Sequence, residues 1–460
     1  MFRKVNIAVV VSMVPPLLIS VLYLRKYFIN HELSHLIVAI LSIALVSFLG
    51  LSLRKSAAFK TKLVTISIGT LFSIYVVELL LNFFPSVIGD TAATIQEMRA
   101  AIATQMGVPF DKREKLEVVT DLRKNGDRWY PGVPTVDTSS GAMSLRVNGN
   151  SILPLGMVGE ANIVLCNESG YWATFASDEY GYNNPFGIWQ DRSKIDTVFV
   201  GDSFVVGHCV KSGESFVDRM RARFPRTINL GADGSGPLVQ LARIKEYLTG
   251  RNIDHVFWVY YEGNDLRDLT DREIPELILI KYLTDDFSQN IISNQEAINS
   301  ALTSFIDNEM QEIMSSQEEK PRKLGAVLSH ISLTNVRLLL FQFKKMYFQP
   351  DIQYDLNIFR EVISKAKSAV ERSGGKLVFI YLPDYYRYGN IRKLLPSSRM
   401  RDDVLRLIDS LDIDIIDIDL VFRRQGDPTM LFPFGAWGHY NARGHSIVAD
   451  EILRYLNQNK

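Results

Sequence analysis

Three long apolar segments occupy the first ninety residues, and they restrict what this part of the chain can form more than any other feature. The segments are Val5–Leu24, Leu36–Leu53 and Leu63–Phe84. A helix needs about 20 mostly apolar residues to cross a bilayer, and each segment approaches or reaches that length. We therefore predict three transmembrane helices within residues 1–90. The alternative is a cleaved signal peptide followed by a soluble core, but no small-residue cleavage site ends the first segment.

Basic residues predict how these helices are oriented. The loop between the second and third segments, "RKSAAFKTK", holds four basic residues and no acid. Cytoplasmic loops are enriched in Lys and Arg, and Arg3 and Lys4 place the N-terminus on the same side. Three spans then leave everything after about residue 85 outside the cytoplasm, which in a bacterium is the periplasm or outer surface.

Charge and cysteine usage restrict the exported part further. The chain is formally neutral, and residues 1–90 carry eight basic residues against three acids, which leaves the remainder mildly acidic. A mildly acidic domain is not suited to binding nucleic acid. Both cysteines, Cys166 and Cys209, fall in this part, and an oxidising compartment favours a disulfide between them. Two free thiols are the alternative.

The exported part divides into two regions by its sequence pattern. Residues 91–193 are predicted to hold a helical neck over 92–125, followed by an irregular β-rich segment. Residues 194–460 alternate between short apolar strands and amphipathic helices. The predicted strands are "DTVFVGD", "TINLG", "HVFWVYYE", "KLVFIYLP" and "IDIIDI". Residues 270–350 interrupt this alternation with helical runs, which we interpret as a packed helical insertion.

This alternation is typical of an α/β fold with a parallel sheet covered by helices on both faces. In such a sheet, ligands bind beyond the carboxyl ends of the strands, so the residues after each strand are candidates for a site. Four polar blocks follow this rule: "GDSFVVG" with Ser203, "NLGADGSG" with Gly231, "EGND" with Asn264, and "HYNARG" with His439. Each block is weak evidence alone, since Gly and Asn-Asp commonly form turns and caps.

Together and in this order, the four blocks resemble those of the SGNH/GDSL hydrolase superfamily. The resemblance covers about a third of the chain, in 194–269 and 376–457. It implies a flavodoxin-like three-layer α/β/α sandwich. It also implies that Ser203 is the nucleophile and His439 the base. The backbone N–H groups of Ser203 and Gly231, with the Asn264 side chain, would form the oxyanion hole.

The sequence departs from the family at one position, because Ala436 stands where the family usually has an Asp three residues before the His. That Asp normally orients the imidazole and stabilises its cation. Three alternatives follow. A backbone carbonyl holds the ring of a Ser–His dyad, which we expect; a carboxylate from elsewhere substitutes, with Asp427 the nearest upstream; or the site is weakened or inactive.

Two further histidines are less suggestive. His445 lies six residues after His439, a spacing that matches no standard zinc motif, so we expect neither a metal nor another cofactor. His208 is interpreted as a loop residue near the rim of the site.

The sequence thus predicts a membrane-anchored, extracytoplasmic serine esterase. An acyl ester, such as acetyl, on an envelope or secreted polysaccharide is the expected substrate, although the partner could be an acylated carbohydrate or a lipid. Proteins of polysaccharide modification are expected partners. Two alternatives stay open: an O-acyltransferase that uses the same Ser and His, and a non-catalytic binding or assembly module with this fold.

Overall fold

The computed structural model describes scattered positions between 6 and 25, residues 33–83, and most of 92–459. Within 92–459 the description leaves out 127, 135, 138–140, 143, 191–193, 319–332, 334, 338, 341–353 and 390–395. The chain divides into two compact units. One comprises Met1–Asp90 with Lys320–Gln349, and the other comprises Thr91–Glu319 with Pro350–Lys460.

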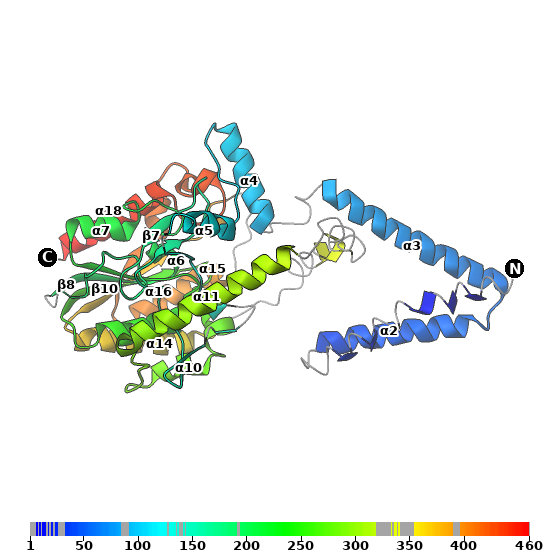
Figure 1. Ribbon diagram of the computed structural model, residues 1–460, viewed down its shortest axis with the longest axis horizontal. Coiled ribbons are helices and arrows are strands. Elements are labelled where there is room, and N and C mark those ends of the chain that lie inside the picture. The colour runs from blue at the N-terminus through cyan, green and yellow to red at the C-terminus, as the bar shows by residue number, and fades with distance from the viewer. Residues whose placement is uncertain are drawn as a thin grey trace. The chain divides into compact units, whose positions relative to one another are not determined.

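The first unit is built from helices α2 (Leu33–Ser52) and α3 (Ala57–Phe83) (Figure 1). Among the described residues, the helix Ala57–Leu81 is the one that is long and apolar enough to cross a membrane, and the apolar helix Ala39–Ser52 is shorter. The predicted segment Val5–Leu24 lies partly outside the described residues. One candidate span therefore stands, and three spans stay a prediction.

Part of the predicted insertion belongs to this first unit. Glu78 of α3 accepts hydrogen bonds from the main-chain N–H groups of Asn335 and Val336, at 3.0 and 2.8 Å. These N–H groups open a short helical stretch, so the carboxylate satisfies donors that a helix start otherwise leaves without a partner. Glu78, an acid within an apolar helix, thus serves to hold residues of the insertion.

The second unit contains a five-stranded parallel sheet in the order β12-β11-β10-β8-β9. Its strands are β8 (Ile195–Gly201), β9 (Thr227–Gly231), β10 (Ile253–Tyr261), β11 (Lys376–Leu382) and β12 (Asp414–Asp417). In chain order this is the 2-1-3-4-5 arrangement of flavodoxin-like folds. The predicted α/β fold with a parallel sheet is confirmed, and each predicted strand is present.

Helices cover both faces of this sheet and make three layers. Side chains alternate along the strands, so that Phe199 and Phe257 face one side while Val198 and Trp258 face the other. The first face packs against α7 (Phe216–Arg223), α17 (Ile418–Phe422) and α18 (Ala442–Gln458). The second packs against α8 (Pro237–Arg243), α14 (Leu356–Arg372) and α16 (Arg401–Asp409). Figure 1 shows α7 and α18 on one side of the sheet, with α14 and α16 on the other.

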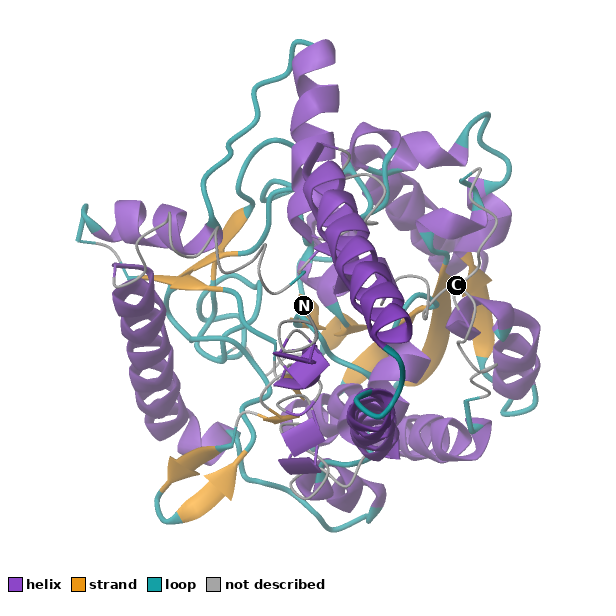
Figure 2. Ribbon diagram, turned by 90° about the vertical axis from the view of Figure 1, so that its right-hand side faces the viewer, coloured by secondary structure: helices purple, strands orange, loops and turns teal. Residues whose placement is uncertain are grey.

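The predicted neck and β-rich segment are present as short elements. The helices are α4 (Ala92–Gln105) and α5 (Lys115–Arg123). The strands β1 (Trp129–Pro131), β6 (Asn162–Val164) and β7 (Thr174–Ala176) form a small mixed sheet. Two hairpins lie between them: β2 (Val136–Asp137) with β3 (Gly141–Ala142), and β4 (Leu145–Val147) with β5 (Asn150–Ile152). These pieces lie outside the main sheet (Figure 2).

The first half of the predicted insertion packs within the second unit. It contains α10 (Leu277–Ile280) and the longer α11 (Gln295–Glu318), and α9 (Asp265–Asp268) lies just before it. Leu279, Ile298, Leu302 and Ile306 are buried in the same core as the sheet. The helical run predicted over 335–348 falls mostly outside the described residues.

Candidate active site

Ser203 lies at the first turn after β8, at the N-terminus of the short helix α6 (Ser203–Val206). Asp202 fixes this turn, because its Oδ1 accepts the Phe204 N–H at 2.9 Å. Gly201 permits the tight approach to β10, since a Cβ there would lie 2.9 Å from the Val259 carbonyl oxygen. The sequence thus places the serine hydroxyl at the carboxyl edge of the sheet, where α/β folds bind ligands.

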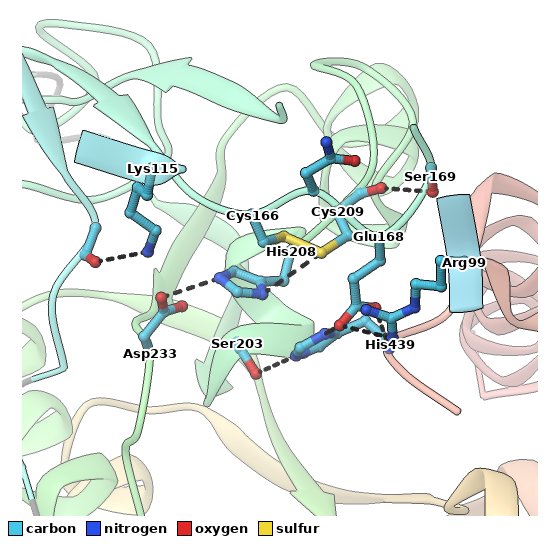
Figure 3. The surroundings of a disulfide bond; sticks show 12 residues. Arg99, Lys115, Cys166, Glu168, Ser169, Ser203, His208, Cys209, Asp233 and His439 are labelled. Atoms are coloured by element: carbon cyan, nitrogen blue, oxygen red, sulfur yellow. Dashed lines mark hydrogen bonds and ion pairs between the residues drawn. A yellow bond between two sulfur atoms is a disulfide. The ribbon is translucent and has the colours of Figure 1, made fainter. Parts of the chain in front are cut away.

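His439 is 236 positions after Ser203 in sequence, in the segment before α18, and its ring lies beside the Ser203 hydroxyl. Its Nε2 lies 2.8 Å from the Ser203 Oγ (Figure 3). Asn441 anchors the segment that carries this histidine, because its side chain caps α18 by accepting the N–H groups of Arg443 and Gly444. The predicted pair therefore lies at hydrogen-bond distance, in the geometry required for a base to take the serine proton.

Glu168, which sequence analysis missed, completes the arrangement. Its Oε1 lies 3.2 Å from the His439 Nδ1, and its Oε2 accepts the main-chain N–H of His439 at 2.7 Å. Burial by itself would raise the pKa of Glu168, but the His439 charge and hydrogen bond, with the charge of Arg99, lower it to about 2. Burial by itself would lower the pKa of His439. The charge and hydrogen bond of the Glu168 carboxylate outweigh this effect of burial, so the pKa of His439 is raised. Glu168 is thus an ionised partner of the imidazole.

This finding corrects the expected dyad and the candidate Asp427. The group at the Nδ1 of His439 is a carboxylate and not a backbone carbonyl. Asp427 instead caps a short 3-10 helix, where its Oδ1 accepts from the Thr429 N–H at 3.0 Å and from the Thr429 hydroxyl at 2.6 Å. An exposed cap of this kind satisfies local backbone donors, and it leaves the role of the acid to Glu168.

Arg99 of α4 forms an ion pair with Glu168. One of its terminal nitrogens lies 3.3 Å from Glu168 Oε1 and also donates to the Trp437 carbonyl oxygen. Both side chains are nearly buried, at 6% and 11% exposure. Both side chains pack directly on the backbone of Gly438, because a Cβ there would overlap the Glu168 carboxylate and the Arg99 guanidinium unless one of them moved. The predicted neck therefore contributes a residue to the surroundings of the site.

The disulfide explains how Glu168 reaches the sheet. Cys166 and Cys209 are bonded, with their Cα atoms 5.4 Å apart, and they are 43 positions apart in sequence. Cys209 follows the nucleophile turn, and Cys166 is two residues before Glu168. The Ser169 hydroxyl also donates to the Cys209 carbonyl at 3.2 Å (Figure 3). The predicted pairing is therefore present, and it ties the segment that carries the acid to the loop after Ser203.

The expected oxyanion donors are only partly available. The Gly231 N–H donates to the Asn229 Oδ1 at 2.8 Å, so this group is not free to bind an oxyanion. Gly231 serves close packing instead, since a Cβ there would lie 2.5 Å from the Val206 nitrogen. The Asn264 amide donates one hydrogen to Asp268 Oδ2 at 2.9 Å, and a primary amide has a second N–H to offer.

His208 and His445 differ in where they lie: the first is beside His439, and the second is buried against the Phe216 backbone. His208 lies beside His439, with ring centroids 4.5 Å apart, and its Nε2 is 3.0 Å from Asp233 Oδ2. His445 is fully buried, and its Nδ1 accepts the Phe216 N–H at 3.2 Å. Burial lowers the pKa of His445 to about 3, so this ring is neutral and structural.

Two clusters of described residues have donor atoms close enough for a metal ion. They are Cys166 with His208 and Cys209, and Glu168 with Cys209 and His439. Both contain Cys209, whose sulfur is bonded to Cys166. A disulfide sulfur is not a thiolate, which is the form that ligates metals. The arrangement is therefore one of a nucleophile, a base and an acid, which is the set used for acyl transfer to and from serine.

No family model and no curated protein matches the chain. Several solved structures are similar to the chain at low identity. A member of the lipolytic protein G-D-S-L family from Veillonella parvula has 13% identity and a TM-score of 0.30, over 57% of this chain and 97% of that one. A two-domain esterase active on acetylated mannans has 12% identity and a TM-score of 0.29, over 58% of this chain and 49% of that one. LAE5, an alpha/beta hydrolase from the metagenome of Lake Arreo, has 14% identity and a TM-score of 0.31, over 56% and 93%. Likenesses this low carry no argument about activity, which has to come from the site itself.

Proposed function

We propose that this protein is a serine esterase of the SGNH/GDSL type, anchored in a membrane and acting outside the cytoplasm. The observation that carries the proposal is the chain of contacts from Ser203 through His439 to Glu168. A serine hydroxyl is a weak nucleophile until a base takes its proton, and an imidazole held by a carboxylate is suited to that task.

The geometry supports an ordinary double displacement. The Ser203 oxygen attacks the ester carbonyl while its proton passes to His439 Nε2, and Glu168 stabilises the resulting imidazolium. His439 then returns the proton to the leaving alcohol, and the acyl group stays on Ser203. Water, deprotonated by the same imidazole, releases the acid. The Ser203 N–H and the second N–H of Asn264 are the groups that we assign to the oxyanion.

The substrate we propose is an acyl ester, such as an acetyl ester, of an envelope or secreted polysaccharide. This follows from the proposed topology, in which three N-terminal spans leave the α/β unit outside the cytoplasm. A reporter that is active only outside the cytoplasm, fused after Lys460, is expected to be active. An inactive reporter, with a cytoplasmic reporter active at the same position, would contradict the topology and remove the argument for an envelope substrate.

An O-acyltransferase shares every step up to the acyl-enzyme, and only the acceptor differs. The experiment is to incubate the purified full-length chain in detergent with p-nitrophenyl acetate, with and without an added oligosaccharide. We expect release of acetate that does not depend on the oligosaccharide and is lost in Ser203→Ala. Acetyl groups recovered on the sugar in place of acetate would favour transfer. An aryl acetate left intact would favour the non-catalytic module.

A further inference from the structure

Two aromatic side chains contact each other across two loops: Trp437 in the loop that carries His439, and Tyr386 in the turn after β11. Trp437, two residues before His439, is 37% exposed. Its ring is stacked near the ring of Tyr386, with centroids 6.3 Å apart and an interplanar angle of 28°. Tyr386 lies in the turn that follows β11, so both rings belong to loops that ligands approach in this fold. A large, exposed aromatic residue in such a loop is a candidate for binding.

The two loops are held to each other and to the core. The Tyr385 hydroxyl donates to the Gly435 carbonyl at 2.9 Å, which joins the loop after β11 to the loop before His439. Arg387 is anchored by its Nε, which donates to buried Glu262 Oε1 at 2.8 Å. Arg99 fixes the Trp437 carbonyl. A surface whose backbone is already fixed loses little entropy when it binds a ligand.

The loop before His439 also maintains an unfavourable backbone conformation. Phe434 has a φ of 56°, in the left-handed region that residues with a Cβ avoid. Its ring lies 6.2 Å from that of Phe110, and the Asn441 side chain donates to the neighbouring Phe432 carbonyl at 3.1 Å. Such strain is commonly found at active sites and ligand clamps. Trp437 lies three positions after Phe434, in the same loop.

The form of this surface distinguishes between ligand classes. A flat aromatic face binds the C–H face of a pyranose ring, while the sugar hydroxyls stay in water. A long acyl chain needs an enclosed apolar cavity. Four cavities of 630, 710, 330 and 280 Å³ in the described part of the chain are lined mostly by polar and charged residues, and Ser203 and Trp437 line none of these four.

We propose that Trp437 and Tyr386 form a platform that binds a sugar ring of an O-acylated polysaccharide beside Ser203. This rests on the proposed esterase function, and it names the residues that bind the carbohydrate part of the proposed substrate. The sugar ring stacks on the platform, and the ester group it carries reaches the Ser203 hydroxyl. The platform is a binding element, and it takes no part in proton transfer.

The test compares substrates that do and do not contain a sugar. KM is measured for chemically acetylated hexasaccharides of xylose, mannose and glucose, for p-nitrophenyl acetate and for p-nitrophenyl octanoate. In Trp437→Ala, the ratio of the hexasaccharide KM to the aryl acetate KM is expected to rise at least tenfold for one of the sugars, and Trp437→Phe should retain most of the binding. Phe186→Ala is the matched control, because Phe186 is also exposed, at 65%, and has no place in the site.

Two results would overturn the platform: an unchanged ratio for all three sugars, or a larger loss on the octanoate than on the sugars. A wild-type chain that leaves p-nitrophenyl acetate intact would refute the esterase and not the platform. In that case, the platform is tested by binding, measured as quenching of tryptophan fluorescence by the three hexasaccharides. Quenching that is lost in Trp437→Ala supports the platform, and the absence of any binding rejects it.

Discussion

Glu168 contacts His439 through both of its carboxylate oxygens, one on the ring at 3.2 Å and one on the main chain at 2.7 Å. The contact with Nδ1 orients the imidazole ring of His439, and the contact with the main-chain N–H fixes the backbone of the same residue. A family Asp three residues before the histidine would come from the same loop. Here the acid comes from a segment 271 residues away in sequence, and so the site depends on how the β-rich region packs on the sheet.

The first prediction concerns pH. The titratable or charged groups around His439 are Glu168, Asp202, Asp233, His208 and His445, with Arg99 beside Glu168. Glu168 raises the pKa of His439, and the base must be neutral to act, so wild-type activity falls as pH drops through that raised pKa. Removing the charge in Glu168→Gln lowers this pKa, and the acid limb of the kcat/KM profile should move to lower pH. A limb that stays in place or moves upward would contradict the electrostatic role of Glu168.

Arg99→Gln should move the same limb in the opposite direction. Glu168 stays held by two groups of His439, and without the guanidinium its negative charge is uncompensated, so the pKa of His439 rises further. We also expect kcat to fall by about tenfold, because the Glu168 position and the Trp437 carbonyl lose a shared anchor. Arg99→Lys keeps the charge and should restore the wild-type limb. A loss of activity with no movement of the limb in Arg99→Gln would indicate a purely structural role.

The disulfide is predicted to support both stability and the site. Closing a loop of 43 residues contributes about 4 kcal/mol by the chain-entropy estimate. The double variant Cys166→Ser/Cys209→Ser should therefore have a lower Tm. Measured well below that Tm, it should also have a lower kcat, because Glu168 is no longer tied to the nucleophile loop. A folded variant with wild-type kcat would show that packing alone positions the acid.

Gly438→Ala tests how closely Glu168 and Arg99 approach the backbone. A methyl group at this position would clash with both side chains, so one of them must move. We expect kcat to fall by tenfold or more while the KM for p-nitrophenyl acetate changes little, since the lost contacts orient the base and do not bind a small ester. Gly250→Ala is the matched control, because Gly250 also has a positive φ, 75°, and a Cβ there meets nothing within 4 Å. Equal activity of the two variants would contradict the packing described for the site.

The sequence predicted those parts of the fold that local patterns determine. Apolar strands such as Val198–Val200 alternate with amphipathic helices, and the carboxyl ends of parallel strands meet at one edge, which is where Ser203 was expected. The pairing of Ser203 with His439 came from the resemblance of the four blocks to the SGNH/GDSL superfamily. Glu168 could not be found in this way, because a lone acid in an irregular segment has no periodicity or motif. One signal did exist. A bond between Cys166 and Cys209 brings residues near 166 to the nucleophile loop, and Glu168 is the carboxylate that follows.

The predicted role of Gly231, as an oxyanion donor, was wrong because its N–H already has a hydrogen-bond partner. A glycine after a strand is needed either for close packing or for a free N–H, and the sequence does not distinguish the two. The Oδ1 of Asn229, two residues earlier, accepts the hydrogen bond of the Gly231 N–H. Side-chain to backbone hydrogen bonds of this kind are common for Asn and depend on the local conformation.

The most direct measurement is the rate at which a fluorophosphonate labels Ser203, with the labelled peptide identified by mass spectrometry. We expect labelling in the wild-type chain and none at this position in Ser203→Ala. Glu168→Gln should be labelled more slowly by on the order of 10⁴-fold, the size of the loss when the acid of a serine triad is removed. Asp427→Asn, which removes the other candidate acid, should be labelled at the wild-type rate. Slow labelling of Asp427→Asn with normal labelling of Glu168→Gln would contradict the assignment of Glu168 as the acid of this site.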